Sequence, residues 1–250
     1  MTPKLPTKLK KEPLIDAVFE MRFSGSGPVS EILPGLLFGR LEGKKSIENL
    51  PASQVPKPLR DVDPNLQFAP VTRLNWNNYT VNIGNRMISI GCNYPYPGWG
   101  KFRSAIIEVM SFLKDIDILQ SINRYSMKYI DLVPSNNIEH QISLINMDIS
   151  IAGHKLKKES FMFQIEITRD GFNNLITIVP SASAKLIDGS QREGIIIDVD
   201  TINNIEEATI KKIMDADFDG KLDGLHQTNK AVFFDCLKQE TIDELGPTYE

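Results

Sequence analysis

The sequence predicts an α+β fold with antiparallel sheets and amphipathic helices packed on one face. Segments with the period-two alternation of strands occur in groups instead of alternating with helices. Asn and Gly pairs, which tolerate the backbone angles of tight hairpin turns, separate several of these segments. Strands followed by a helical pattern occur in each half of the chain. We therefore expect an N-terminal half, 1–134, and a C-terminal half, 135–250, as two related sheet-plus-helix units or one continuous domain.

The composition is that of an ordinary globular protein. The chain has 250 residues, of which 41% are hydrophobic and 24% charged, and this composition excludes disordered and collagen-like classes. No run approaches the roughly 20 apolar residues that span a bilayer, and the basic segment Met1–Lys11 has no apolar stretch behind it. We expect a cytoplasmic protein that does not bind membranes. Cys92 and Cys236 lack C-x-x-C spacing, so neither a zinc site nor a disulfide framework is predicted.

Several elements are expected in the first half of the chain. Alternating residues predict a strand over Pro13–Phe23, and residues 25–28 predict a break after it. Helical spacing marks Ser30–Leu41, where Pro34 should confine the helix to its first turn or restart it. Prolines at positions 51, 56, 58 and 64 predict an extended, mobile connection over Asn49–Pro64.

The next segments predict an antiparallel meander and a helix that faces the core. The strands of the meander are expected at Phe68–Trp76, Tyr79–Ile83 and Met87–Cys92. A stripe with a period of 3.6 residues predicts a helix over Lys101–Leu119, and Ser121–Val133 should return to the sheet as a strand.

The second half is predicted to contain four strands followed by a long helix. The strands are expected at Ile142–Ile151, Phe161–Thr168, Leu175–Pro180 and Ile195–Val199, with turns at Gly153, Asp170–Gly171 and Asp188–Gly189. Asp170–Gly171 is the clearest hairpin signal in the chain. Glu206–Gln239 continues in helical phase.

Charge is unevenly distributed along the sequence. The net charge is -4, yet the first 134 residues carry an excess of cations and the remaining residues an excess of carboxylates. The two halves could attract each other within the fold or between protomers, or the basic half could steer an acidic partner. A pI near 5.5 argues against a dedicated DNA-binding domain.

An acidic stretch in the last predicted helix resembles the start of a calcium loop. Asp215, Asp217 and Asp219 stand at alternate positions before Gly220, but His226 occupies the twelfth position, where a bidentate Glu is required. No metal is therefore predicted here. On a helical wheel, Asp223 joins Asp215, Asp219 and His226 along the flank of an apolar stripe. This flank is either a solvated surface or, as an alternative, the site of a metal-dependent hydrolase.

Asn229 falls inside the same apolar stripe. A buried amide requires partners, so we expect it to hydrogen-bond a sheet edge or a loop. His226 lies three residues earlier and forms with Asn229 a candidate binding pair, but no nucleophile is close enough in sequence to complete a triad.

A second candidate surface combines aromatic rings with positive charge. Tyr94, Tyr96 and Trp99 are followed by Lys101 and Arg103, a set that can stack a base and hold a phosphate, or bind a peptide. The alternative is a hydrophobic staple in which Trp99 and Phe102 pack at the start of the helix. Gly-rich phosphate loops, H-E-x-x-H and G-x-S-x-G are absent from the sequence, and no cofactor or catalytic residue is predicted. The candidate binding residues are Tyr94, Tyr96, Trp99, Lys101, Arg103, His226 and Asn229.

Three stretches carry a resemblance to a known family. Lys8–Phe23, Arg124–Pro134 and Gly224–Leu237 resemble the opening, middle and closing motifs of a sporadically distributed prokaryotic family of about this length, whose function is uncharacterised. Leu225, His226, Asn229 and Phe233 match the closing motif. The patchy occurrence of that family implies accessory-genome cargo such as phage-defence operons, and the resemblance carries no catalytic residue.

The sequence therefore favours a non-catalytic binding, sensor or adaptor subunit that acts with a protein encoded nearby in an accessory, anti-phage system. A nucleic-acid-binding protein using the aromatic and basic loop is an alternative, as is the metal-dependent hydrolase. A homo-oligomer is a further expected form of the protein.

Overall fold

The fold is α+β, with helices packed against a large antiparallel sheet, as predicted. The computed structural model describes residues 5–24, 28–119, 121–185, 189 and 191–249. Within these residues the main sheet has nine strands in the order β10-β11-β12-β7-β2-β6-β5-β4-β3. Their bounds are β2 Leu14–Phe23, β3 Lys45–Asn49, β4 Pro70–Trp76, β5 Tyr79–Gly84, β6 Met87–Cys92, β7 Ile122–Pro134, β10 Phe163–Arg169, β11 Phe172–Lys185 and β12 Gln191–Ala208.

The chain divides into two compact units, and neither is a single stretch of sequence. The first unit comprises residues up to Asp16, Lys128–Thr201 and His226–Glu250, and the second comprises Ala17–Met127 and Ile202–Leu225. Strands β2, β7 and β12 and helix α6 (Phe218–Asp235) each contribute residues to both units. Both units draw on chain from either side of residue 134.

In the second unit, one face of the sheet is apolar and the other is polar. The register pairs Phe19 with Ile90, Ile90 with Val81, and Val81 with Leu74, and all four are fully buried. The alternate residues are polar, as where Asn82 accepts from Arg73 and donates to Ser89. Helix α1 (Val29–Arg40) contacts β4 and β5, and helix α3 (Trp99–Ile116) places the ring of Phe102 on Tyr79 of the apolar face.

Several elements of the second unit were predicted from the sequence. The meander β4-β5-β6 pairs antiparallel in the expected order, and β2 begins one residue after the predicted start. Helix α3 buries the predicted stripe, which includes Phe102, Ile106, Val109 and Leu113. Its period of 3.6 residues and its length made the helix easy to identify.

Two proline-based predictions were wrong. The segment Asn49–Pro64 contains a short 3-10 helix, Pro51–Gln54, and helix α2, Lys57–Val62. Prolines stand in the first turn of both, where a backbone N–H is not needed for a helical hydrogen bond. Pro34 lies inside a continuous 12-residue α1 instead of ending it, and its ring is buried in the core.

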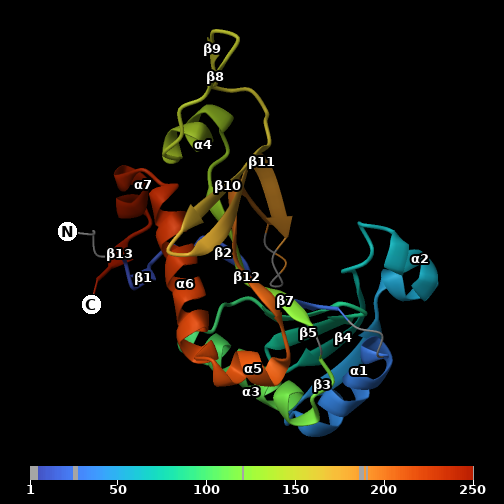
Figure 1. Ribbon diagram of the computed structural model, residues 1–250. Coiled ribbons are helices and arrows are strands. Elements are labelled where there is room, and N and C mark those ends of the chain that lie inside the picture. The colour runs from blue at the N-terminus through green and yellow to red at the C-terminus, as the bar shows by residue number, and fades with distance from the viewer. Residues whose placement is uncertain (1–4, 25–27, 120, 186–188, 190, 250) are drawn as a thin grey trace. The chain divides into compact units, whose positions relative to one another are not determined.

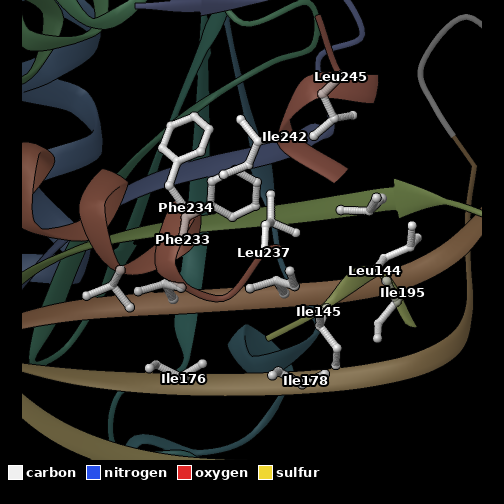
Figure 2. Close-up of a cluster of buried hydrophobic side chains, with 14 residues drawn as sticks. Leu144, Ile145, Ile176, Ile178, Ile195, Phe233, Phe234, Leu237, Ile242 and Leu245 are labelled. Atoms are coloured by element: carbon white, nitrogen blue, oxygen red, sulfur yellow. The ribbon is translucent and has the colours of Figure 1, made fainter. Parts of the chain in front are cut away.

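In the first unit, the end of α6 and helix α7 (Gln239–Glu244) cover strands β11 and β12. Phe233, Phe234 and Leu237 face Ile176, Ile178 and Ile195 in a cluster of buried side chains (Figure 2). Ile242 and Leu245 extend this cluster beyond the end of α6. The β8-β9 hairpin, with strands Ser150–Ile151 and His154–Lys155, projects beyond helix α4, Ile138–Leu144 (Figure 1).

The predicted strand Ile142–Ile151 was wrong, because most of it is not extended. Helix α4 ends at Leu144, and only Ser150–Ile151 is a strand. The side chain of Asn137 accepts hydrogen bonds from the backbone N–H groups of Glu139 and His140. This N-cap, just outside the alternating segment, starts the helix.

The predicted helix Glu206–Gln239 is interrupted. Strand β12 continues to Ala208, helix α5 covers Ile210–Asp215, and α6 begins only at Phe218. Asp217 lies between the two helices at φ 58°, in the left-handed region, where a helix cannot continue. The apolar phase nevertheless continues after the break, since Phe218, Leu222 and Leu225 are buried.

The hairpin predicted at Asp170–Gly171 is present. It joins β10 to β11, with both turn residues at positive φ. The predicted break at residues 25–27 and the predicted turn residue Asp188 lie outside the described residues. Among the helices that the structure describes, none has the length and apolar character needed to cross a bilayer.

Candidate functional site

The aromatic residues of the first candidate surface pack on one buried ring. Phe102, on the first turn of α3, is fully buried, and the rings of Tyr96, Trp99 and Tyr79 contact it with centroid distances of 6.1, 6.4 and 6.4 Å. Trp99 and Tyr96 approach it edge-on, which is a favourable geometry for aromatic pairs. The staple interpretation of this segment therefore accounts for much of its aromatic content.

The polar atoms of the same segment bind the acidic stretch near the start of α6, inside the second unit. The Trp99 indole N–H donates to Asp223 Oδ1 at 3.0 Å, and Arg103 Nε donates to the same oxygen at 2.9 Å. A second guanidinium nitrogen of Arg103 lies 3.2 Å from Asp219 Oδ2. The hydrogen bond to Asp223, followed by the attraction of both carboxylates, raises the pKa of Arg103.

Asp215, at the start of the acidic stretch, also binds a cation. Lys114, near the end of α3, donates to Asp215 at 2.6 Å. Arg103 and Lys114 of α3 therefore bind the carboxylates that the sequence pattern placed on the flank of another helix. Within the described residues, no group of three or more His, Cys, Asp and Glu side chains is arranged to hold a metal ion. Lys101 is exposed, and its carbonyl accepts from the Tyr79 hydroxyl.

His226 and Asn229 lie in the first unit, on the part of α6 that faces the sheet. The Tyr129 hydroxyl oxygen lies 3.0 Å from His226 Nδ1, and the centroids of the two rings are 5.6 Å apart. The Asn229 side chain is 1% exposed and donates to the Val199 carbonyl at 2.7 Å. The expected burial of Asn229 is thus present, but its acceptor belongs to the interior strand β12 and not to a sheet edge.

A second buried amide, which was not among the candidate residues, lies on the neighbouring strand. Asn174 of β11 is fully buried, accepts from the Thr201 hydroxyl at 2.7 Å and donates to the Phe172 carbonyl at 3.2 Å. Nearby, Thr228 donates to Asp170 at 3.4 Å. These polar groups are paired within the unit: the Asn229 bond joins α6 to β12, and the Asn174–Thr201 bond joins β11 to β12. The only sequence signal for Asn174 is an Asn at an inward position of an alternating strand.

Asp131 is the most unusual ionisable group of the first unit. This β7 residue is 6% exposed, and burial, followed by repulsion from Glu12 and Asp198, raises its pKa well above the usual value. The nearby Cys236 thiol has a pKa of about 11, chiefly because it is buried. A thiol with this pKa is protonated at neutral pH and a poor nucleophile. Asp131 lies in a motif used for the family resemblance, but no charge pattern in the sequence identified it.

A serine and a histidine meet at the start of α4. Ser135 Oγ lies 2.9 Å from His140 Nδ1 in an exposed pocket of about 650 Å³, lined by residues between Pro134 and Ser143. The Ser135 hydroxyl also contacts the backbone of Asn137, and the Ser135 carbonyl accepts from Gln141. These bonds are those of a turn that leads into a capped helix.

No model of a known protein family matches the chain, and no curated protein matches it.

An exposed apolar surface that was not among the candidate sites lies on α1. Its inward face buries Leu33, Pro34 and Leu37. Its outward face carries Ile32 and Leu36, 44% and 40% exposed, with Gly35 and Gly39 beside them. The charged residues of the helix, Glu31 and Arg40, stand at its two ends. A helix that is apolar on both faces is typical of one that is covered on both sides.

Proposed function

We propose that the chain is a non-catalytic binding subunit that docks an apolar helix of a partner protein on the outward face of α1. The single observation that carries this proposal is the apolar character of α1 on both its faces. A surface helix normally presents charged or polar residues to water. Here Ile32, Gly35, Leu36 and Gly39 occupy that face, within an arc of roughly 100° at the helical 100° per residue.

The two glycines support a partner that approaches closely. Each Gly inside a helix costs about 1 kcal/mol relative to Ala. A Cβ added to Gly35 or Gly39 would meet nothing within 4 Å, so packing inside the described chain does not require glycine at either position. A second helix that packs its backbone against this face would supply that requirement. Gly35 and Gly39 are one turn apart and open a flat track beside Ile32 and Leu36.

The candidate surface on α3 supports the nucleic-acid alternative less well. Asp219 and Asp223 already bind Arg103, and Asp223 also binds the Trp99 indole. A phosphate would have to compete with two carboxylates for the guanidinium, and those carboxylates repel it. The metal-dependent hydrolase is disfavoured by the same ion pairs, because the carboxylates face cations and not one another.

The cellular setting rests on the sequence alone. A cytoplasmic location and a place in an anti-phage system are proposed from the composition and from the family resemblance of the three motifs. The partner is then a protein encoded beside this chain.

The test is co-expression of the tagged chain with its genomic neighbours, followed by affinity purification and mass spectrometry. A stoichiometric neighbour that co-purifies with the wild type and is lost in Leu36→Glu is the expected result. If no neighbour is recovered, or if Leu36→Glu recovers the same protein in the same amount, the proposal is wrong.

A further inference from the structure

Strand β10 is an open edge of the sheet in the first unit. It pairs with β11 on one side, and no strand of the described chain pairs on its other side. Arg169 and Phe172 flank the two-residue turn and pair with each other. Backbone bonds to the partner alternate along an antiparallel strand. The backbone groups of Gln164, Glu166 and Thr168 therefore point away from β11, toward the open side.

This edge lacks the usual protection against pairing. Natural edge strands are commonly short, or carry Lys, Pro or a bulge. β10 has seven residues, its sequence FQIEITR contains neither Lys nor Pro, and its register with β11 is regular. The opposite edge strand of the sheet, β3, has five residues and begins with a lysine.

The side chains of β10 form one apolar and one polar row. Phe163, Ile165 and Ile167 share the face on which Ile176 and Ile178 of β11 are buried. Ile165 and Ile167 themselves remain 43% and 37% exposed, because the helical cover described for β11 does not bury them. On the other face, Gln164 and Glu166 bind side chains of β11 and so leave the edge clear.

We propose that β10 pairs antiparallel with β10 of a second copy of this chain, with the two-fold axis at Ile165. In this register Ile165 lies opposite Ile165 of the second copy, and Ile167 lies opposite Phe163. Glu166 lies opposite Gln164, which can donate to the carboxylate. The three outward-pointing residues supply the backbone hydrogen bonds, and the apolar row of one copy continues into that of the other.

Side-chain pairing and strand length favour this register over its neighbours. Centring the axis on Glu166 would place two carboxylates directly opposite each other, and directly opposed like charges destabilise a sheet. Centring it on Ile167 would place Ile165 opposite Arg169. Centring it on Gln164 would pair only residues 163–165 within the two strands, against residues 163–167 when the axis is at Ile165. The strand is therefore best paired with itself at Ile165, which favours a second copy over an unrelated extended peptide.

The first test is the concentration dependence of the mass of the full chain in solution, measured by analytical ultracentrifugation. The wild type should form dimers as concentration rises. Ile165→Lys should weaken dimerisation by about tenfold or more, because two ammonium groups would face each other across the axis. Ile151→Lys is the matched control, since Ile151 is 69% exposed in the same unit but lies on the β8-β9 hairpin. A wild type that stays monomeric, or an equal effect of both variants, would overturn the proposal.

A cysteine scan tests the register independently of any loss of folding. Residues directly opposite at a non-hydrogen-bonded position bring their Cβ atoms within about 5 Å, close enough for a disulfide. Ile165→Cys should form a disulfide-linked dimer on mild oxidation, whereas Ile167→Cys alone should not. Ile167→Cys mixed with Phe163→Cys should form the mixed dimer. Cys92 is buried and the half-buried Cys236 thiol has a raised pKa, so the native cysteines give little background. Cross-linking of Ile167→Cys to itself, or none at Ile165→Cys, contradicts the register.

Discussion

Arg103 of α3 and Asp223 of α6 bind each other at 2.9 Å, although 120 residues separate them in sequence. The same carboxylate oxygen accepts from the Trp99 indole at 3.0 Å. The sequence presented a basic, aromatic surface and an acidic surface as separate candidates. Inside the second unit, Trp99 and Arg103 of the first bind Asp223 of the second.

This ion pair should contribute modestly to stability, because both side chains are partly solvated. We expect a coupling free energy of about 0.5–1 kcal/mol between Arg103→Ala and Asp223→Ala in a double-mutant cycle, measured by urea unfolding. The coupling should shrink at high salt, because salt screens exposed charges. A coupling of zero at low salt would show that the pair does not hold the helices together.

Asn229→Ala should lower the free energy of unfolding by about 1–3 kcal/mol. The substitution removes the hydrogen bond to the Val199 carbonyl and leaves that buried acceptor without its donor. Asn65→Ala, at an exposed turn, is the control and should change stability by less than about 0.5 kcal/mol. Equal effects of the two substitutions in chemical denaturation would argue against the buried bond.

Asp131→Asn should stabilise the protein at neutral pH by about 1–3 kcal/mol. A neutral amide avoids the free-energy cost of removing a charged carboxylate from water. Burial raises the pKa of Asp131 on folding, so the folded state holds the proton more tightly than the unfolded state. The free energy of unfolding therefore falls as the pH rises from the unfolded pKa, about 4, through the raised folded pKa.

The advantage of Asp131→Asn should accordingly vanish below about pH 4, where the wild-type carboxyl is protonated in both states. Glu12 and Asp198 also have raised pKa values and face this carboxyl, so their titration overlaps its own. The measurement is thermal or urea unfolding of both proteins across pH, with the exposed Asp148→Asn as control. A stability difference that does not change with pH would contradict the assignment to Asp131.

Gly194→Ala should destabilise strongly or prevent folding. A Cβ at Gly194 of β12 would collide with the Val133 carbonyl of β7, which is backbone and cannot move aside. Gly100→Ala in α3 provides the contrast, because its Cβ would meet nothing and alanine favours a helix. Circular dichroism and melting temperature check both variants. Normal folding of Gly194→Ala would show that the two strands do not approach this closely.

Gly35→Ala and Gly39→Ala should each raise the stability of the chain and lower its affinity for the partner. In the isolated chain each should stabilise by about 0.5–1 kcal/mol, because alanine favours the helix and nothing obstructs its methyl group. Each should also weaken partner binding, since the added methyl blocks close approach of a helix. Thermal unfolding and a binding titration measure the two effects. Improved stability with unchanged affinity would remove the glycines from the interface.

Local sequence patterns predicted the helices and strands whose buried residues recur with a regular period. They failed where a single residue determines whether a helix begins, continues or ends. Helix α3 and the β4-β5-β6 meander follow from residue spacing and turn residues. The cap at Asn137, the left-handed Asp217 and the first-turn prolines each changed an element through one backbone contact or angle. The pairing of Arg103 with Asp223 depends on the tertiary arrangement, which no local pattern carries. The sequence shows that α1 is apolar and has few charges, but it does not show that Ile32 and Leu36 are exposed.

The most direct test of the proposed function is the affinity of the co-purifying neighbour for three forms of the chain, measured by isothermal titration calorimetry. The wild type and Leu59→Glu, which changes a leucine that is 58% exposed on α2, should bind with the same dissociation constant. Leu36→Glu should weaken binding by about a hundredfold or more, because it buries a carboxylate in an apolar interface. Equal affinities for all three forms would contradict a docking site on α1.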